Sequence, residues 1–112
     1  MERQLARLAE RGINLLLASE ITTHFIFERD GFIALVERKA SGFGNIGAPG
    51  LLVEPAGFAA LVWRDGEPWF VARGLAQQAS PGQVAAIRGF AHDLEYALAA
   101  DRIPGLAVEA AP

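Results

Sequence analysis

Two Arg-Asp-Gly tripeptides, each placed between two runs of apolar residues, constrain the fold more than any other feature of the sequence. Asp-Gly supplies the two positive φ angles that a type I′ turn requires, so it joins the strands of a tight β-hairpin. One hairpin is expected over residues 21–28 and 32–39, around Asp30-Gly31. A second is expected over residues 58–64 and 67–73, around Asp65-Gly66.

The two-residue loop also fixes which side chains share a face of the sheet. It places His24 opposite Glu37, and side chains then alternate between the two faces. One face of the first hairpin carries Phe25, Phe27, Phe32 and Val36, and the other carries Ile26, Ile33 and Leu35. The second hairpin is likewise apolar on both sides. An antiparallel sheet with one solvated face alternates apolar and polar residues, and this sequence does not.

Helical patterns stand at both ends of the chain. Apolar residues at three- and four-residue steps predict a helix over residues 2–11. Gly12 is either the residue that ends this helix or an interior glycine, and residues 13–18 are then a connection or a frayed continuation. Ser80, Pro81 and Gln83 form the start of a second helix, with a serine cap, a proline in the first turn and a capping box. Its apolar stripe runs to about residue 100.

The order of these elements predicts one two-layer α+β domain over residues 1–103, followed by a flexible tail at 104–112. Its antiparallel sheet is expected to contain about four to five strands, the fifth being a short strand at 51–54. A glycine-rich connection separates the two hairpins.

Two helices cannot cover both apolar faces of such a sheet well. An exposed apolar face of this size marks an interface, and a twofold homodimer is the commonest way to cover one. Ile26, Ile33 and Leu35 are the best candidates for that interface. The sequence therefore favours a small, non-catalytic, homodimeric interaction or regulatory module.

The glycine-rich segment supports an alternative, a pocket for a small anionic or aromatic ligand. Residues 42–48 match the G-x-G-x-x-G/A pattern of dinucleotide sites, but Pro49-Gly50 follows at once and no helix opens there. Residues 42–50 are expected to form either a connection between the two hairpins or a lid over the ligand pocket. The candidate ligand-binding residues are Gly42, Gly44, Asn45 and Gly47, with His24 and either Trp63 or Trp69 lining the pocket.

Catalysis receives only weak support. Glu37 could orient His24 as a general base, but cross-strand pairs of this kind also simply stabilise sheets. No activated serine or cysteine nucleophile is evident. His92 shares a helical face with Arg88 and Glu95, which predicts a solvated face and no metal site.

Composition excludes further classes of function. The 112-residue, 12.0 kDa chain has no cysteine, so thiolate metal sites and disulfides are excluded. Its net charge is −3, so nucleic-acid binding is not expected. The charged N-terminal residues do not resemble a signal peptide, and no apolar run is long enough to span a membrane. A cytoplasmic protein without a cofactor is expected.

Overall fold

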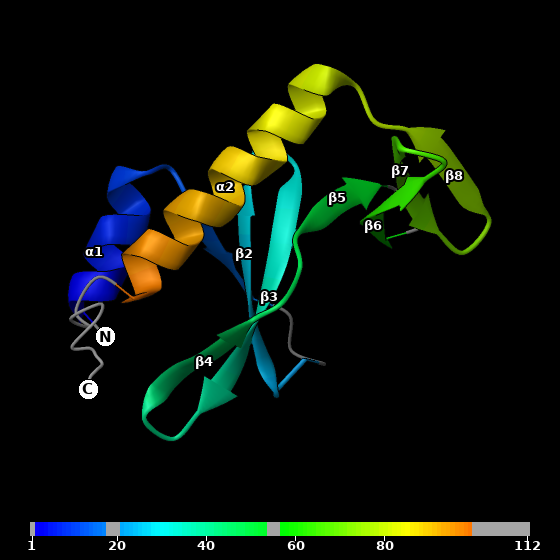
Figure 1. The fold of residues 1–112 in the computed structure, drawn as a ribbon. Helices are drawn as coiled ribbons and strands as arrows, with labels where there is room; N and C mark the ends of the chain where they lie inside the picture. The colour runs from blue at the N-terminus through cyan, green and yellow to red at the C-terminus, as the bar shows by residue number, and fades with distance from the viewer. Residues whose placement is uncertain (1, 18–20, 54–56, 100–112) are drawn as a thin grey trace, which may run out of the picture.

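The computed structural model describes residues 2–17, 21–53 and 57–99, which form an α+β fold with an antiparallel sheet (Figure 1). The described residues contain eight strands, so the expected four to five strands, built from two Asp-Gly hairpins, were too few. The elements are α1 (Glu2–Glu10), β1 (Asn14–Leu16), β2 (His24–Arg29), β3 (Phe32–Lys39), β4 (Gly42–Ile46), β5 (Gly50–Val53), β6 (Gly57–Arg64), β7 (Glu67–Ala72), β8 (Leu75–Gln78) and α2 (Pro81–Ala99). The expected tail at 104–112 and the domain end at 103 lie outside the described residues.

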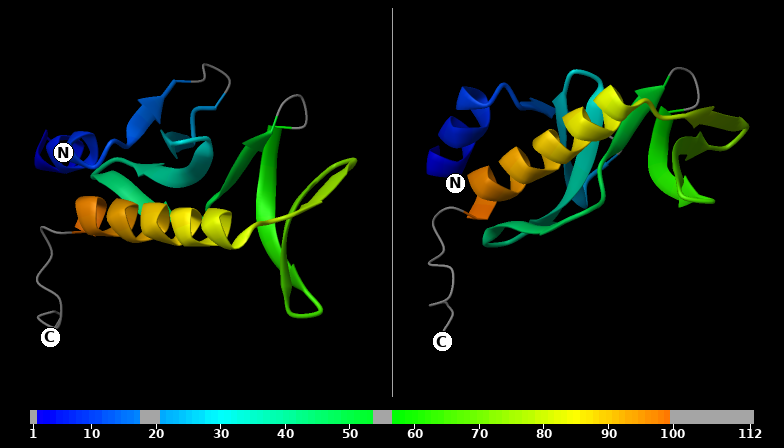
Figure 2. Two further views of the ribbon diagram at one scale, coloured as in Figure 1. Left: turned by 90° about the horizontal axis from the view of Figure 1, so that it is seen from above. Right: turned by 45° about the horizontal axis from the view of Figure 1, so that its top comes forward.

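The strands follow one another across the sheet in the order β1-β2-β3-β5-β6-β7-β8. β4 pairs with the C-terminal half of β3, and β5 pairs with its N-terminal end. Figure 2 shows that the sheet is curled, so that β6, β7 and β8 stand at a steep angle to β1, β2 and β3. Asp30 and Asp65 have positive φ angles of 55° and 51°. Asp30 lies in the turn between β2 and β3, where His24 pairs with Glu37. Asp65 lies in the turn between β6 and β7, where Arg64 pairs with Glu67.

Three strands lie where the sequence pattern predicted none. The prediction of a glycine-rich connection over residues 42–50 was wrong, because Gly42–Ile46 forms β4 and pairs with β3. Residues 14–16 form β1, which pairs with β2 directly after the positive φ of Gly12. Gly74, with a φ of 76°, reverses the chain between β7 and β8. The chain therefore forms more hairpins than its Asp-Gly pairs alone indicate.

The predicted start of α2 is confirmed. Ser80 Oγ accepts a hydrogen bond from the Gln83 backbone N–H at 3.0 Å, and Gln83 Oε1 accepts one from the Ser80 N–H at 2.9 Å. These reciprocal bonds form a capping box, which satisfies backbone donors that the first helical turn leaves without intrahelical partners.

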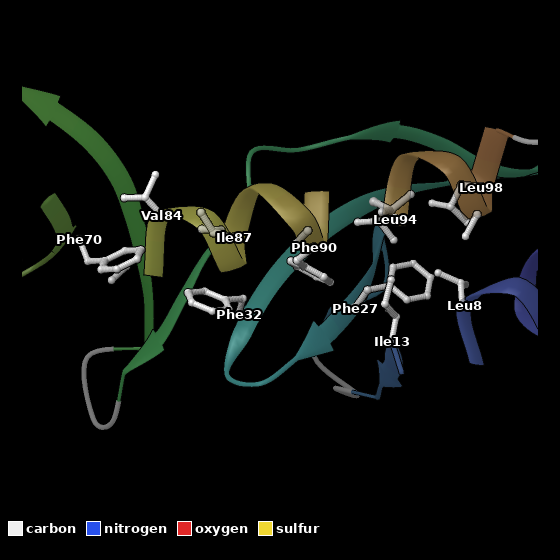
Figure 3. Close-up of a cluster of buried hydrophobic side chains, with 14 of the residues drawn as sticks. Leu8, Ile13, Phe27, Phe32, Phe70, Val84, Ile87, Phe90, Leu94 and Leu98 are labelled. Atoms are coloured by element: carbon white, nitrogen blue, oxygen red, sulfur yellow. The ribbon is translucent and has the colours of Figure 1, made fainter. Parts of the chain in front are cut away.

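One hydrophobic core joins both helices to a single face of the sheet, here called the helix-side face (Figure 3). Leu8 of α1 and the apolar stripe of α2 pack there. The buried members from the strands are Phe27, Phe32, Ala34, Val36, Ala59 and Phe70, and those from α2 are Val84, Ile87, Phe90, Leu94, Ala97 and Leu98. The opposite face, here called the outer face, contributes none of its described residues to this core.

Side chains of α1 hold it against the C-terminal end of α2. Gln4 Nε2 donates to the Leu98 carbonyl at 2.6 Å, and Arg7 Nε donates to the Ala97 carbonyl at 2.9 Å. These carbonyls belong to the last turn of α2, where intrahelical donors are lacking. Within the described residues, neither helix combines the length and apolarity needed to cross a membrane.

Candidate functional site

The outer face of the sheet is apolar across most of its strands. Leu52, Phe58 and Leu16 leave 42%, 38% and 37% of their surfaces exposed, and they share this one face of the sheet. Exposed apolar side chains are informative when they share a face in this way, because scattered ones are common. Strand alternation places the following apolar residues on this face: Leu16, Ile26, Ile33, Leu35, Leu52, Phe58, Val62, Trp69 and Val71. None of them belongs to the helix-side core.

The centre of the outer face is shaped by Gly50. A Cβ atom there would lie 2.6 Å from Cζ of Phe58, so the missing side chain allows the phenyl ring to lie on β5. Gly50 is also the pairing partner of Ile33, which is only 6% exposed. Of the three predicted interface residues, Ile33 is thus buried within the single chain, while Ile26 and Leu35 are half-buried.

A pocket of about 400 Å³ opens beside this apolar centre, where β3 meets β4. It brings together four residues that the sequence proposed for ligand binding or catalysis. Its lining residues are His24, Leu35, Glu37, Asn45, Ile46, Gly47, Ala48 and Phe58. Apolar and polar groups therefore converge on one hollow, as in many small-molecule sites.

Glu37 is the best-connected polar group of the pocket. Its Oε1 atom accepts the Asn45 backbone N–H at 3.1 Å and lies 3.9 Å from Lys39 Nζ. His24 does not hydrogen-bond to Glu37; its Nδ1 atom instead lies 2.8 Å from Thr23 Oγ1. The two residues face each other across the strands, but the carboxylate does not orient the imidazole as it does in a general-base pair.

The glycines of β4 permit close packing of strands and side chains. A Cβ atom at Gly44 would lie 2.9 Å from Glu37 Oε1 and 2.7 Å from Lys39 Cε, so both side chains cross β4 at this residue. The Gly47 N–H donates to the Leu35 carbonyl at 2.8 Å, and Gly42 pairs with Lys39. Such hydrogen bonds distinguish the segment from the open glycine loops that present amides to phosphates.

The two tryptophans do not line this pocket. Trp69 pairs with Val62 and lies on the outer face, whereas Trp63 pairs with Pro68 and lies on the helix-side face. Trp63 borders a separate hollow of about 410 Å³ next to the first turns of α2. Neither tryptophan therefore joins His24 and the glycine segment in lining the pocket of His24, Glu37 and Asn45.

The shortest ion pair of the described residues lies away from both hollows. Arg29 Nη1 is 2.8 Å from Asp93 Oδ2, and the hydrogen bond from Arg29 holds the pKa of Asp93 below its ordinary value. The backbone N–H of Gly31 and the side-chain amide of Asn14 donate hydrogen bonds to the Glu28 carboxylate, and these bonds likewise lower the pKa of Glu28. No cluster of three or more metal-ligating side chains occurs in the described ranges.

The sequence matches no protein-family model and no curated protein, and no solved structure matches the chain. The exposed outer face and its adjacent pocket are thus the features from which a function can be inferred.

Proposed function

We propose that the protein is a non-catalytic interaction module that forms a twofold homodimer through the outer face of its sheet. One observation carries this proposal: both helices pack on the helix-side face, while the outer face presents large apolar side chains to solvent. An exposed apolar face of this kind is typical of a protein interface.

Charge favours a second copy of the chain as the partner. The outer face is bordered by charges of both signs that lie close to each other. Glu37 lies beside Lys39, and Arg64 is the pairing partner of Glu67. A twofold axis brings the same patch against itself, so a border of mixed charge gives no strong like-charge repulsion.

The outer face is large enough for a small interface. Its seven main-path strands, at about 4.8 Å spacing and about 17 Å length, cover about 580 Å² when followed along the curled sheet. Two copies together would offer about 1,160 Å², close to the lower end of the range of about 1,200–2,000 Å² that specific interfaces bury.

Replacing Leu52 by glutamate tests this proposal. Leu52 is 42% exposed on the outer face, and a carboxylate there would be buried without a partner in the dimer. We expect Leu52→Glu to weaken dimerisation at least 100-fold, equivalent to about 2.8 kcal/mol. Sedimentation velocity over a concentration series measures the change.

Leu5→Glu is the matched control, because Leu5 is 38% exposed but lies on α1. We expect this variant to keep the wild-type association, with circular dichroism showing that both variants are folded. The proposal is wrong if Leu52→Glu associates like the wild type, or if both variants lose association equally.

Small-molecule binding in the pocket of His24, Glu37 and Asn45 is the second candidate function. The observation that favours it is the convergence of these residues with the Phe58 ring, which suits an aromatic ligand carrying polar groups. Native mass spectra of protein incubated with a panel of aromatic carboxylates test it. Added mass is expected for the wild type and for His92→Ala, but not for His24→Ala. The absence of added mass from the wild type across the panel would contradict this candidate.

A further inference from the structure

A further hollow, of about 530 Å³, opens where β1 and β2 separate, and is here called the β1–β2 hollow. The two strands stay paired as far as Leu16 and Ile26. Leu17 then follows β1, while Ile21 and Thr22 precede β2, and all three residues line the hollow. Its volume lies in the range of small-molecule sites.

Apolar side chains form most of the wall of the β1–β2 hollow. The apolar lining residues are Leu16, Leu17, Ile21, Phe25 and Ile26. Leu17 leaves 88% of its surface exposed, so it contributes almost nothing to the core of the single chain. Covering such a side chain with an apolar ligand removes its surface from water and is therefore favourable.

The polar side chains of the wall favour an anion. They belong to Thr22, His24 and Arg38, and none of the described lining residues carries a carboxylate. Glu37 lies opposite His24 but lines the neighbouring pocket, where Lys39 Nζ is 3.9 Å from its carboxylate. The wall of the β1–β2 hollow thus combines an apolar surface with one permanent positive charge, that of Arg38.

Arg38 is well placed to bind the anion. Its guanidinium carbon lies 4.3 Å from the centre of the Phe25 ring, and this ring packs edge-on against Phe43 with centroids 4.9 Å apart. Stacking uses the flat face of the guanidinium and leaves the N–H groups at its edge available. No described carboxylate forms an ion pair with Arg38. A ligand carboxylate can therefore accept two parallel hydrogen bonds from it.

We infer that the β1–β2 hollow binds a small carboxylate with an apolar chain. The carboxylate pairs with Arg38, and the chain lies against Leu17 and Ile21. One guanidinium balances one carboxylate, whereas a phosphate dianion would keep an unbalanced charge beside an apolar wall. This site goes beyond the proposed function, because it shares only His24 with the pocket where β3 meets β4 and does not require a dimer.

Isothermal titration calorimetry of the full chain with octanoate, below its micellar range, tests this inference. Octanoate is expected to bind. Octylamine has the same chain and the opposite charge, and acetate has the same charge and almost no chain, so both are expected to bind at least tenfold more weakly. Arg38→Gln is expected to weaken octanoate binding at least tenfold. Arg73→Gln is the matched control, because Arg73 is also exposed but lies in the turn between β7 and β8.

Leu17→Ser separates binding from folding. Since Leu17 is almost fully exposed, this variant is expected to unfold like the wild type and to bind octanoate roughly fivefold more weakly. Leu5→Ser, on α1, is the control and is expected to bind octanoate like the wild type.

The dimer variant Leu52→Glu distinguishes this inference from the proposed function. Leu52 does not line the β1–β2 hollow, so octanoate is expected to bind this variant as it binds the wild type, whether or not the chain forms a dimer. The inference is overturned if octanoate does not bind, if octylamine or acetate binds as tightly, or if Arg38→Gln binds octanoate like the wild type.

Discussion

Arg29 shows how one side chain can join three parts of a small fold. Its Nη1 atom donates to Asp93 on α2 at 2.8 Å and to the carbonyl of Arg11, just after α1, at 3.0 Å. The hydrogen bond from Arg29 lowers the pKa of Asp93 in the folded chain. The ionised carboxylate therefore stabilises the fold above its ordinary pKa of 3.8, and this contribution is lost as the pH falls through the lowered folded value.

Asp93→Asn is expected to reduce the free energy of unfolding by about 1 kcal/mol at pH 7, since the pair is partly exposed to solvent. The difference from the wild type is expected to shrink below about pH 4. Urea unfolding at several pH values measures it. The control, Glu95→Gln, changes an exposed acid of the same helix and is expected to have almost no effect. A loss that did not change with pH would contradict the role assigned to this carboxylate.

Several residues of the candidate pocket can be predicted from the sequence, because a local turn sequence sets their pairing across the strands. Asp30-Gly31 sets the pairing that brings His24 opposite Glu37. Asn45 joins them only because β4 pairs with β3 in a tight hairpin, and a segment with two glycines among five residues does not indicate such a strand. The placement of Trp63 and Trp69 on opposite faces, in contrast, is predicted by strand alternation around Asp65-Gly66, and the pairing of β6 with β7 confirms it.

Among the elements, α2 has the clearest sequence signal because its start is encoded locally. Ser80→Ala removes the side-chain acceptor of the Gln83 N–H and is expected to cost about 1 kcal/mol of stability, measured by chemical denaturation. Ser41→Ala, at an exposed turn between β3 and β4, is the control and is expected to be nearly neutral. Equal losses in the two variants would show that the capping box contributes little.

The strands β1, β4 and β8 lack such local signals. β4 contains glycine at two of its five positions, yet Phe43 packs its ring 4.9 Å from that of Phe25. β8 ends in two glutamines and depends on pairing with β7. Tertiary packing overrides weak strand propensity in these segments, which is why a pattern read along the chain misses them.

At the scale of the whole molecule, the sequence indicates that both faces of the sheet are apolar, but not which face the helices cover. Phe27 and Phe70 lie on the face that packs against Phe90 and the rest of the α2 stripe, and Phe58 lies on the other. Both faces carry aromatic and branched apolar side chains, so the face that the helices cover depends on how the curled sheet fits against α2.

The central claim is that the outer face is covered by a second copy of the chain. The most direct test is the mass of the untagged wild-type protein in native mass spectrometry, recorded over a range of micromolar concentrations. The account predicts a dimer of about 24 kDa, twice the chain mass of 12.0 kDa. A mass of 12.0 kDa at every concentration would contradict it.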